Sequence, residues 1–159
     1  MRRAQRGDAA ALERLVAELL PYLGRICGAI ALDRGDDALQ EAMIMVVRKI
    51  GTLREPAAVK GWARRIAVRE AVRVATTGGA SSVDPDALAA STDVADHASD
   101  AEVRAVLASL PPEQRTILVL RHVDGLSEAE VAEALDVAVG TVKSRASRAR
   151  RSFRERWSA

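Results

Sequence analysis

Aromatic residues, cysteine and histidine are scarce in this 159-residue sequence, and these shortages exclude several kinds of protein. Aromatic side chains make up 3% of the chain, so a core must be built from aliphatic residues. The 31 alanines favour helices over a β-sandwich. Cys27 is the single cysteine and lies in an apolar run. It indicates a buried thiol and excludes an internal disulfide or a cysteine-rich zinc site.

Long hydrophobic runs are missing as well. No stretch reaches 18 unbroken apolar residues, and the basic N-terminus is not followed by an apolar run of the signal-peptide type. Hydrophobic residues at 48% and charged residues at 29% are typical of a soluble globular protein. We therefore expect a cytoplasmic protein without membrane insertion.

The motifs of the common enzyme classes are also absent. His97 and His122 lie far apart without the spacing of metal ligands, and there is no glycine-rich phosphate loop or nucleophile elbow. The sequence therefore predicts no enzymatic activity, no cofactor and no metal site.

Charge is distributed unevenly along the chain. Residues 1–76 hold 14 basic and 9 acidic side chains, and residues 101–159 hold 10 basic and 8 acidic ones. Between them, residues 77–100 hold five aspartates and no basic residue. This order indicates two polyanion-binding modules joined by an acidic spacer.

Apolar residues recur at helical spacing on both sides of that spacer. The first 76 residues predict three helices, with a kink at Pro21 or a restart near Leu20, an N-cap at Asp36 and a helix beginning at Pro56. The second of these helices is expected to bury Leu39, Met43, Val46, Val47 and Ile50.

The spacer itself is typical of a flexible linker. It combines Gly-Gly, Ser-Ser and Asp-Pro with scattered aspartates and has no periodic apolar face. The expected fold class is all-α: two small helical domains, 1–76 and 101–159, joined by a flexible acidic linker, 77–100. Extended, such a linker is long enough that the two domains need not touch.

The C-terminal domain has the pattern of a helix-turn-helix. Pro111-Pro112 separates two helices, and Asp124-Gly125 predicts a turn. Ser127 and Glu130 form a capping box that starts a short helix. After a tight turn at 135–137, a longer basic helix runs from about Val139, and Ala138 gives it no strong cap.

The basic last helix is the candidate recognition helix. Thr141 and Ser144 are short enough to let its N-terminal end enter the major groove, where Lys143, Arg145 and Arg148 can reach base edges. Further along, Arg150, Arg151 and Arg154 suit phosphate contacts. The alternative is a basic amphipathic helix that only keeps a small domain soluble.

Two further features lie in the N-terminal domain. Arg65, Arg69 and Arg73 form a basic stripe near Trp62, which suits single-stranded or distorted nucleic acid. A solvated helix face and a core tryptophan are the alternatives. An acidic and polar cluster lies at the start of the second predicted helix and consists of Asp36, Asp37, Gln40 and Glu41. Its acidic residues either compensate the helix dipole or form a docking surface for a partner.

Four segments together resemble bacterial sigma factors. They are Asp37-Ala38-Leu39-Gln40-Glu41, Trp62-Ala63-Arg64-Arg65-Ile66-Ala67, Leu110-Pro111-Pro112-Glu113-Gln114-Arg115 and Gly140-Thr141-Val142-Lys143-Ser144-Arg145. The short chain, with two domains and a linker, resembles the extracytoplasmic-function (ECF) group of the sigma-70 family.

The resemblance implies an RNA polymerase sigma factor that binds core polymerase and directs promoter-specific transcription initiation. Asp37, Gln40 and Glu41 would contact the clamp coiled coil of the β′ subunit, and the β subunit is a further partner. The implied −10 element contacts are Arg54, Lys60, Trp62, Arg65, Arg69 and Arg73. The implied −35 element contacts are Thr141, Lys143, Ser144, Arg145, Ser147, Arg148 and Arg151. An anti-sigma factor is an expected further partner.

Two other functions compete with this interpretation. A helix-turn-helix regulator would bind an operator tightly without polymerase, with residues 1–76 as a dimerisation or effector module. A pure adaptor would show no dependence on DNA.

Overall fold

The computed structural model describes residues 1–77 and 97–158. Within these two ranges the chain is all-α, with helices, turns and no strand. Most of the expected linker lies outside the described residues. At its edges, helix α4 still includes Thr77 and helix α5 begins at His97, so both flanking helices extend beyond the predicted domain boundaries.

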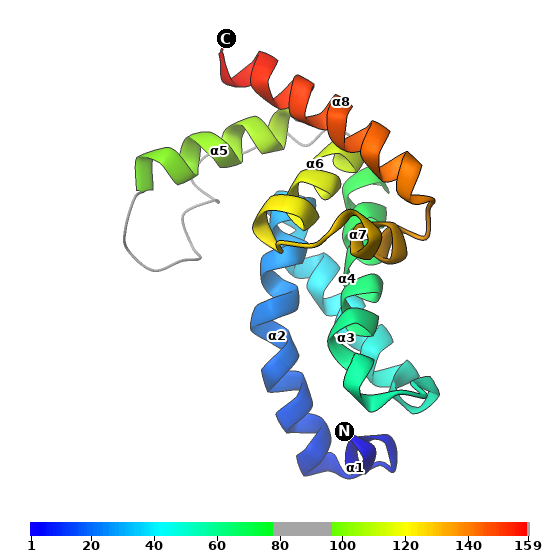
Figure 1. Ribbon diagram of the computed structural model, residues 1–159. Coiled ribbons are helices and arrows are strands. Elements are labelled where there is room, and N and C mark those ends of the chain that lie inside the picture. Colours follow the sequence, from blue (N-terminus) through cyan, green and yellow to red (C-terminus); the bar gives the residue numbers. More distant parts are fainter. Residues whose placement is uncertain (78–96, 159) are drawn as a thin grey trace.

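The N-terminal half is a bundle of three long helices preceded by a short one (Figure 1). The helices α2 (Ala9–Ala31), α3 (Gly35–Lys49) and α4 (Val59–Thr77) pack against one another in all three pairings. The short helix α1 (Arg2–Gln5) packs on α2. Three 3₁₀ turns connect these helices: η1 (Leu32–Arg34), η2 (Ile50–Thr52) and η3 (Pro56–Ala58).

Helix α2 does not restart at Pro21. The helix continues through this residue, which is exposed, while Leu19 and Leu23 on either side are buried. Since Pro21 faces solvent and its neighbours anchor the helix in the core, the missing backbone N–H does not end the helix. Asp8 caps the start of α2 by accepting a hydrogen bond from the Ala11 amide at 2.9 Å.

The prediction that Asp36 caps the second helix is wrong. Helix α3 begins at Gly35 with Arg34 as N-cap, and no side chain caps it. The turn from α2 brings Gly35 so close to Gly28 that a Cβ at Gly35 would lie 2.6 Å from the Gly28 Cα atom. This tight approach starts the helix before Asp36, which lies in its first turn.

The C-terminal half contains four helices and one π-helical segment. They are α5 (His97–Ser109), α6 (Pro112–Leu118), the π segment η5 (Val119–Val123), α7 (Glu128–Leu135) and α8 (Val139–Trp157). Helices α5, α6 and α7 all contact α8. The break at Pro111-Pro112 is confirmed, and buried Arg115 braces it by donating a hydrogen bond to the Leu110 carbonyl at 3.1 Å.

The two halves contact each other and share a hydrophobic core. Helix α4 packs against α6 and α7, and α2 packs against α6 and η5. Buried Leu120 and Val131 of the C-terminal half belong to the same apolar cluster as Leu23 and Ala67 of the N-terminal half. The described parts of the two domains are therefore packed together, although the linker length did not require contact.

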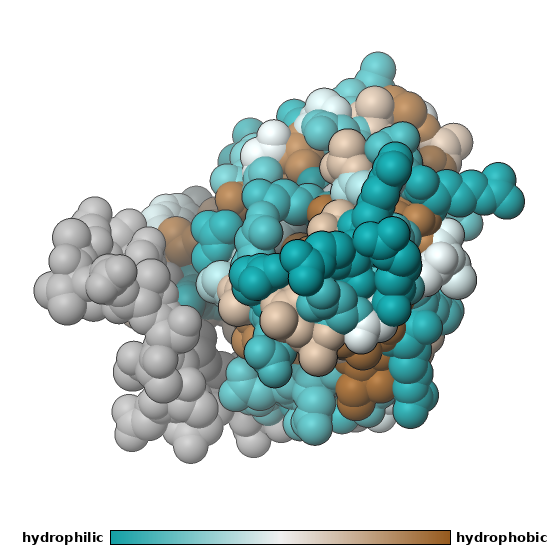
Figure 2. Space-filling view, turned by 90° about the horizontal axis from the view of Figure 1, so that it is seen from below, coloured by the Kyte–Doolittle hydropathy of each residue, from teal (hydrophilic) through white to brown (hydrophobic). Residues whose placement is uncertain are grey.

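Helix α2 is a core helix. By length and composition, the helical run Ala9–Thr52 could cross a membrane. Within it, α2 buries residues such as Leu15, Leu19 and Ile30 against the other helices. Seen from below, hydrophilic residues cover most of the molecular face, and hydrophobic residues form separate patches between them (Figure 2).

Candidate nucleic-acid and polymerase interfaces

Helices α7 and α8 form the predicted helix-turn-helix. The Glu130 amide donates to the Ser127 hydroxyl at 3.2 Å, and the Ser127 amide donates to the Glu130 carboxylate at 2.8 Å. The Ser127 hydroxyl also donates to the Glu130 carboxylate at 2.7 Å, and this bond, together with the one from the Ser127 amide, lowers the pKa of Glu130 below its ordinary value. Asp136 ends α7 in the left-handed conformation, with φ at +55°, and makes the tight turn into α8.

Helix α8 buries one face and presents the other to solvent. Val142, Ala146 and Ala149 are buried against the rest of the domain. Of the predicted −35 contacts, Thr141 and Arg145 are half-buried; the exposed ones are Lys143, Ser144, Ser147, Arg148 and Arg151. As expected, Ala138 precedes α8 without a side-chain cap. The exposed basic face therefore lies next to an open N-terminal end, the arrangement that a recognition helix requires.

Most hydrogen-bonding groups on this face remain available for DNA. Lys143 lies 3.9 Å from the Glu128 carboxylate, an exposed pair that gives little stability. The Ser144 hydroxyl donates to the Thr141 carbonyl at 3.0 Å, so it is partly engaged by the helix itself. Among the described residues, no ion-pair partner holds Arg145, Arg148 or Arg151.

The predicted −10 residues are more dispersed than the −35 residues. Lys60 lies 3.8 Å from Glu18, and Arg73 donates to Glu70 at 2.7 Å. Arg65 donates to Glu133 of α7 at 3.1 Å, and among the described residues no ion-pair partner holds Arg54 or Arg69. All five basic side chains are exposed. Two arginines of the predicted stripe are thus paired with carboxylates in this structure.

Trp62 packs partly buried against the hydrophobic core. This placement fixes the start of α4 and leaves part of the ring accessible.

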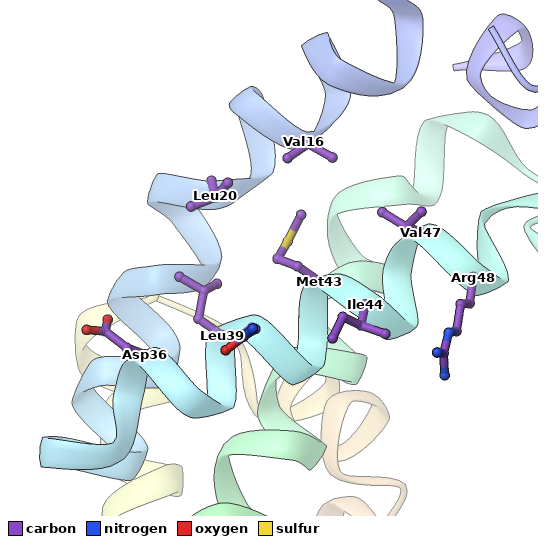
Figure 3. A pocket seen from close by; sticks show the side chains of 9 residues that line it. Val16, Leu20, Asp36, Leu39, Met43, Ile44, Val47 and Arg48 are labelled. Carbon is purple, nitrogen blue, oxygen red and sulfur yellow. The ribbon is translucent and has the colours of Figure 1, made fainter. Parts of the chain in front are cut away.

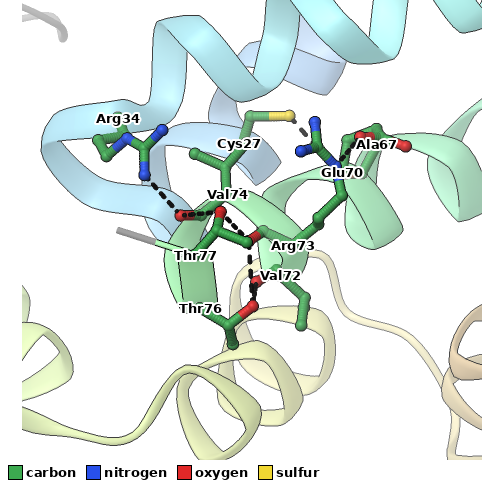
Figure 4. A network of polar contacts seen from close by, with 9 residues as sticks. All are labelled: Cys27, Arg34, Ala67, Glu70, Val72, Arg73, Val74, Thr76 and Thr77. Atoms are coloured by element: carbon green, nitrogen blue, oxygen red, sulfur yellow. Dashed lines mark hydrogen bonds and ion pairs between the residues drawn. The ribbon is translucent and has the colours of Figure 1, made fainter. Parts of the chain in front are cut away.

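A network of polar contacts fixes the C-terminal end of α4 (Figure 4). Arg34, just before α3, donates to the Val74 carbonyl at 2.9 Å, and the Thr77 hydroxyl donates to the Arg73 carbonyl at 2.7 Å. Nearby, burial raises the pKa of the Cys27 thiol to about 12. The thiol is therefore protonated at neutral pH, consistent with the predicted structural cysteine.

An apolar groove lies between α2 and α3 (Figure 3). This α2–α3 groove has a volume of about 540 Å³ and is lined mainly by apolar side chains: Val16, Leu20, Leu39, Met43, Ile44 and Val47. Asp36, Gln40 and Arg48 complete it. The prediction that Val47 is a core residue is wrong, because the residue is 38% exposed at the groove.

The predicted core-binding residues stand beside this groove on α3. Asp37, Gln40 and Glu41 are all exposed, and Gln40 contributes to the groove wall. Only Asp37 of the three forms an ion pair with another described residue, at 3.7 Å from Arg34. The helix therefore offers polar groups next to an apolar surface, a combination that suits a protein partner.

A second apolar groove lies in the C-terminal half and was not predicted from the sequence. This α5–α8 groove has a volume of about 300 Å³ and is lined by Val103, Leu107, Leu118, His122, Val123, Arg150, Phe153 and Arg154. Val123 is 56% exposed. A helical apolar pattern does not distinguish a covered face from an open one, so no sequence signal points to this groove.

Polar contacts between the two halves were also missed. The Tyr22 hydroxyl donates to the Asp124 carboxylate at 3.1 Å, and Arg64 lies 3.7 Å from the same carboxylate oxygen. Arg64 also donates to the Tyr22 hydroxyl at 3.4 Å. The Arg64 and Asp124 side chains are only 15% and 11% exposed. Tyr22 and Asp124 are 102 positions apart, so no local pattern links them.

Comparison with known proteins identifies the family. A family model described as Sigma-70, region 4, matches residues 100–153, which contain the helix-turn-helix. The chain is 32% identical over 169 residues to the ECF RNA polymerase sigma-E factor of Haemophilus influenzae, covering 93% of this chain and 88% of that protein. The chain belongs to the ECF sigma factors.

Other relatives agree with this assignment. The ECF RNA polymerase sigma factor SigM of Mycobacterium tuberculosis is 37% identical over 151 residues, covering 91% of this chain and 76% of that protein. The sigma factor RpoE of Bartonella quintana, solved in complex with the anti-sigma factor NepR, has the same fold. The comparison of the two structures gives a TM-score of 0.70 at 21% sequence identity, and it covers 94% of this chain and 98% of the RpoE chain.

Membership of the family confirms the general function expected from the sequence. The protein is an RNA polymerase sigma factor, a transcription initiation factor that binds core polymerase and promoter DNA. Within the described ranges, no group of three or more His, Cys, Asp or Glu side chains is placed to hold a metal ion.

Proposed function

We propose that this sigma factor divides promoter recognition between its two halves, with α8 contacting the −35 element and α4 the −10 element. The observation that carries the proposal is the exposed basic face of α8 in a helix-turn-helix, within the segment that matches sigma-70 region 4. Its work is positioning rather than catalysis, and it takes place in the cytoplasm.

At the −35 element, α8 enters the major groove. Lys143, Arg145 and Arg148 reach base edges, where a basic side chain to guanine is the common specific contact. Arg151, further along the helix, neutralises phosphate and fixes the docking position. The hydroxyl-bearing residues Thr141, Ser144 and Ser147 supply short polar contacts close to the groove.

At the −10 element, the start of α4 and the loop before it contact the melted strand. Arg54 and Lys60 flank this region, and Trp62 supplies an aromatic surface for a base. Arg65, Arg69 and Arg73 follow the phosphate backbone along α4. Because these contacts are ionic, their strength falls as salt concentration rises.

Core polymerase docks on α3. Asp37, Gln40 and Glu41 contact the clamp coiled coil of the β′ subunit, and the adjoining α2–α3 groove receives apolar side chains of the same partner. The β subunit is a second contact. An anti-sigma factor is a further partner, supported by the structural neighbour RpoE, which was solved with the anti-sigma factor NepR.

Run-off transcription with core polymerase on a pool of genomic promoter fragments tests the proposal. We expect discrete transcripts only when the protein is added. Replacing Arg145 and Arg148 with alanine should reduce them at least tenfold, because each lost base contact costs about 1–3 kcal/mol of discrimination. The matched control is Arg2→Ala with Arg6→Ala in and next to α1, which should leave transcription unchanged.

Two results would contradict the proposal. If the variant with Arg145→Ala and Arg148→Ala drives transcription as well as the unaltered protein, α8 is not the recognition helix. Tight binding to fragments without polymerase, and no transcripts, would favour a regulator that binds operators directly.

A further inference from the structure

The side chain of Gln5 joins helix α1 to the α3–α4 loop, residues 50–58. Its amide nitrogen donates hydrogen bonds to the Leu53 carbonyl at 2.7 Å and to the Ile50 carbonyl at 3.1 Å. These carbonyls lie 48 and 45 positions further along the chain, so the contact is long-range. Figure 1 shows α1 at the end of the N-terminal half where α3 leads into α4. Both amide hydrogens of one glutamine therefore hold this loop.

The α3–α4 loop has few other contacts that fix its middle. Its other side-chain hydrogen bonds between described residues span only two or three positions. The Leu53 amide donates to the Ile50 carbonyl at 3.3 Å, which is long for a backbone hydrogen bond. Ile50 is buried, whereas Gly51, Thr52 and Arg54 are exposed. Gln5 therefore supplies a fixed point that the loop backbone does not supply by itself.

Helix α1 is itself anchored, so Gln5 is held in place from its own side. Ala4 is buried in the core next to α2. Gly7 takes a φ of +86°, which favours glycine, where the chain turns from α1 into α2. The Arg3 guanidinium donates to the Asp8 carboxylate at 2.9 Å and ties the two ends of this turn together. Gln5 thus extends from a fixed helix to the loop.

The two loop carbonyls require a donor at this position. A glutamine amide donates two hydrogen bonds, whereas a carboxylate of the same size only accepts. An apolar side chain would leave both part-buried carbonyls without this donor. Substitution of Gln5 can therefore remove the hydrogen bonds with little change in side-chain size.

We propose that Gln5 is a positioning residue for −10 element recognition, because it fixes the conformation of the loop that contacts the melted strand. The inference rests on the proposed function, which assigns the loop before α4 to that strand. Arg54, a proposed −10 contact, directly follows Leu53, so a shift of the Leu53 carbonyl also moves Arg54. Gln5 acts through the loop backbone and does not itself contact DNA.

Amide hydrogen exchange of the full chain, followed by NMR, tests the anchor without DNA. In the Gln5→Leu variant, the Leu53 amide should exchange at least about tenfold faster, because the loop loses two hydrogen bonds. The amides of α7 and α8 should exchange at unchanged rates. The matched control, Arg3→Gln, removes the Arg3–Asp8 ion pair of the same short helix and keeps Gln5. It should leave exchange of the Leu53 amide unchanged.

Run-off transcription of the same proteins then tests the effect on promoter recognition. Discrimination is the ratio of transcript from a promoter found in the genomic pool to transcript from that promoter with one base changed. Gln5→Leu should lower this ratio at least about threefold at one or more −10 positions and leave every −35 ratio unchanged. A general loss of folded protein lowers all transcripts by the same factor and does not change the ratios. Arg3→Gln should keep all ratios.

Circular dichroism checks that the Gln5→Leu variant keeps its helices. If this variant does not fold, Gln5→Glu removes the donor while the side chain keeps nearly the same shape and stays polar. Exchange of the Leu53 amide and the two sets of ratios are then measured on that variant, with the same expected results.

Three results would overturn the inference and leave the proposed function intact. The first is unchanged exchange of the Leu53 amide after Gln5 is replaced. The second is faster exchange with unchanged −10 ratios, and the third is an equal loss of discrimination at both promoter elements. If the unaltered protein gives no transcripts, or ignores base changes in the −10 element, the proposed function fails, and the inference fails with it.

Discussion

At the scale of single residues, two glycines allow a close backbone approach in the N-terminal half. Gly28 of α2 and Gly35 of α3 meet where the chain reverses direction, and Gly35 is buried. The atoms that a Cβ would meet are backbone atoms, which cannot rotate away. The contact therefore fixes the position of α3 and of the proposed polymerase-binding residues on it.

We predict that Gly35→Ala lowers the free energy of unfolding by about 1–3 kcal/mol, the usual cost of overpacking. Urea denaturation followed by circular dichroism measures the loss. The control is Gly51→Ala, because a Cβ at that exposed position meets no atom within 4 Å. Equal stability of the Gly35 variant and the unaltered protein would show that α2 and α3 can separate at this point.

Residue-level patterns in the sequence predicted local features well. The capping box at Ser127 and the turn at Gly125 depend on neighbours within four positions, and both are confirmed. A helical segment also begins at Pro56, but as the 3₁₀ turn η3, and the α-helix α4 starts at Val59. The prediction at Asp36 is wrong because a long-range contact, Gly28 with Gly35, sets the start of α3. Local preference decides a helix end only where packing does not.

At the scale of elements, the capping box positions the short helix α7 that supports the recognition helix. The Ser127 side chain and the Ser127 amide both bond with Glu130, which holds the first turn of an eight-residue helix. Helices this short are marginal alone, so the cap and the packing on α8 both contribute to their stability.

We predict that Ser127→Ala lowers the free energy of unfolding by about 1 kcal/mol. The hydrogen bonds depress the pKa of Glu130, so their stabilising effect is present above the ordinary value of 4.5 and is lost as pH falls through the depressed value. The variant should therefore lose less stability than the unaltered protein between pH 5 and pH 3. Urea denaturation at several pH values measures both effects, and Ser127→Thr, which keeps the hydroxyl, should behave like the unaltered protein.

At the scale of the whole molecule, the sequence predicted the two helical domains but not their contact. The apolar faces of α4 and α7 can be recognised in the sequence from their helical spacing. That spacing does not indicate which other helix packs against each face. The partners of the polar contact are far apart in sequence, and each alone is an ordinary surface type of residue. For the same reason, the open faces at Val47 and Val123 could not be told from buried ones.

The proposed docking on polymerase belongs to this scale because it joins the chain to a second molecule. We predict that Gln40→Ala with Glu41→Ala lowers affinity for core polymerase at least tenfold while the melting temperature stays within a few degrees. A pull-down with purified core polymerase and a thermal melt measure the two quantities. The control is Glu13→Ala with Glu18→Ala on α2, which should leave the affinity unchanged. If the α3 variant also binds core polymerase with unchanged affinity, the surface around Gln40 and Glu41 is not part of the interface.

The contact of Tyr22 and Arg64 with Asp124 limits how freely the halves can be exchanged between relatives. A chimaera that joins this N-terminal half to another C-terminal half keeps both polar groups but loses the carboxylate that pairs with them. Their burial then carries a cost that neither parent has. The two halves are therefore expected to evolve as a matched pair. A change at Asp124 should be accompanied by a change at Tyr22 or Arg64, although both lie more than fifty positions earlier in the sequence.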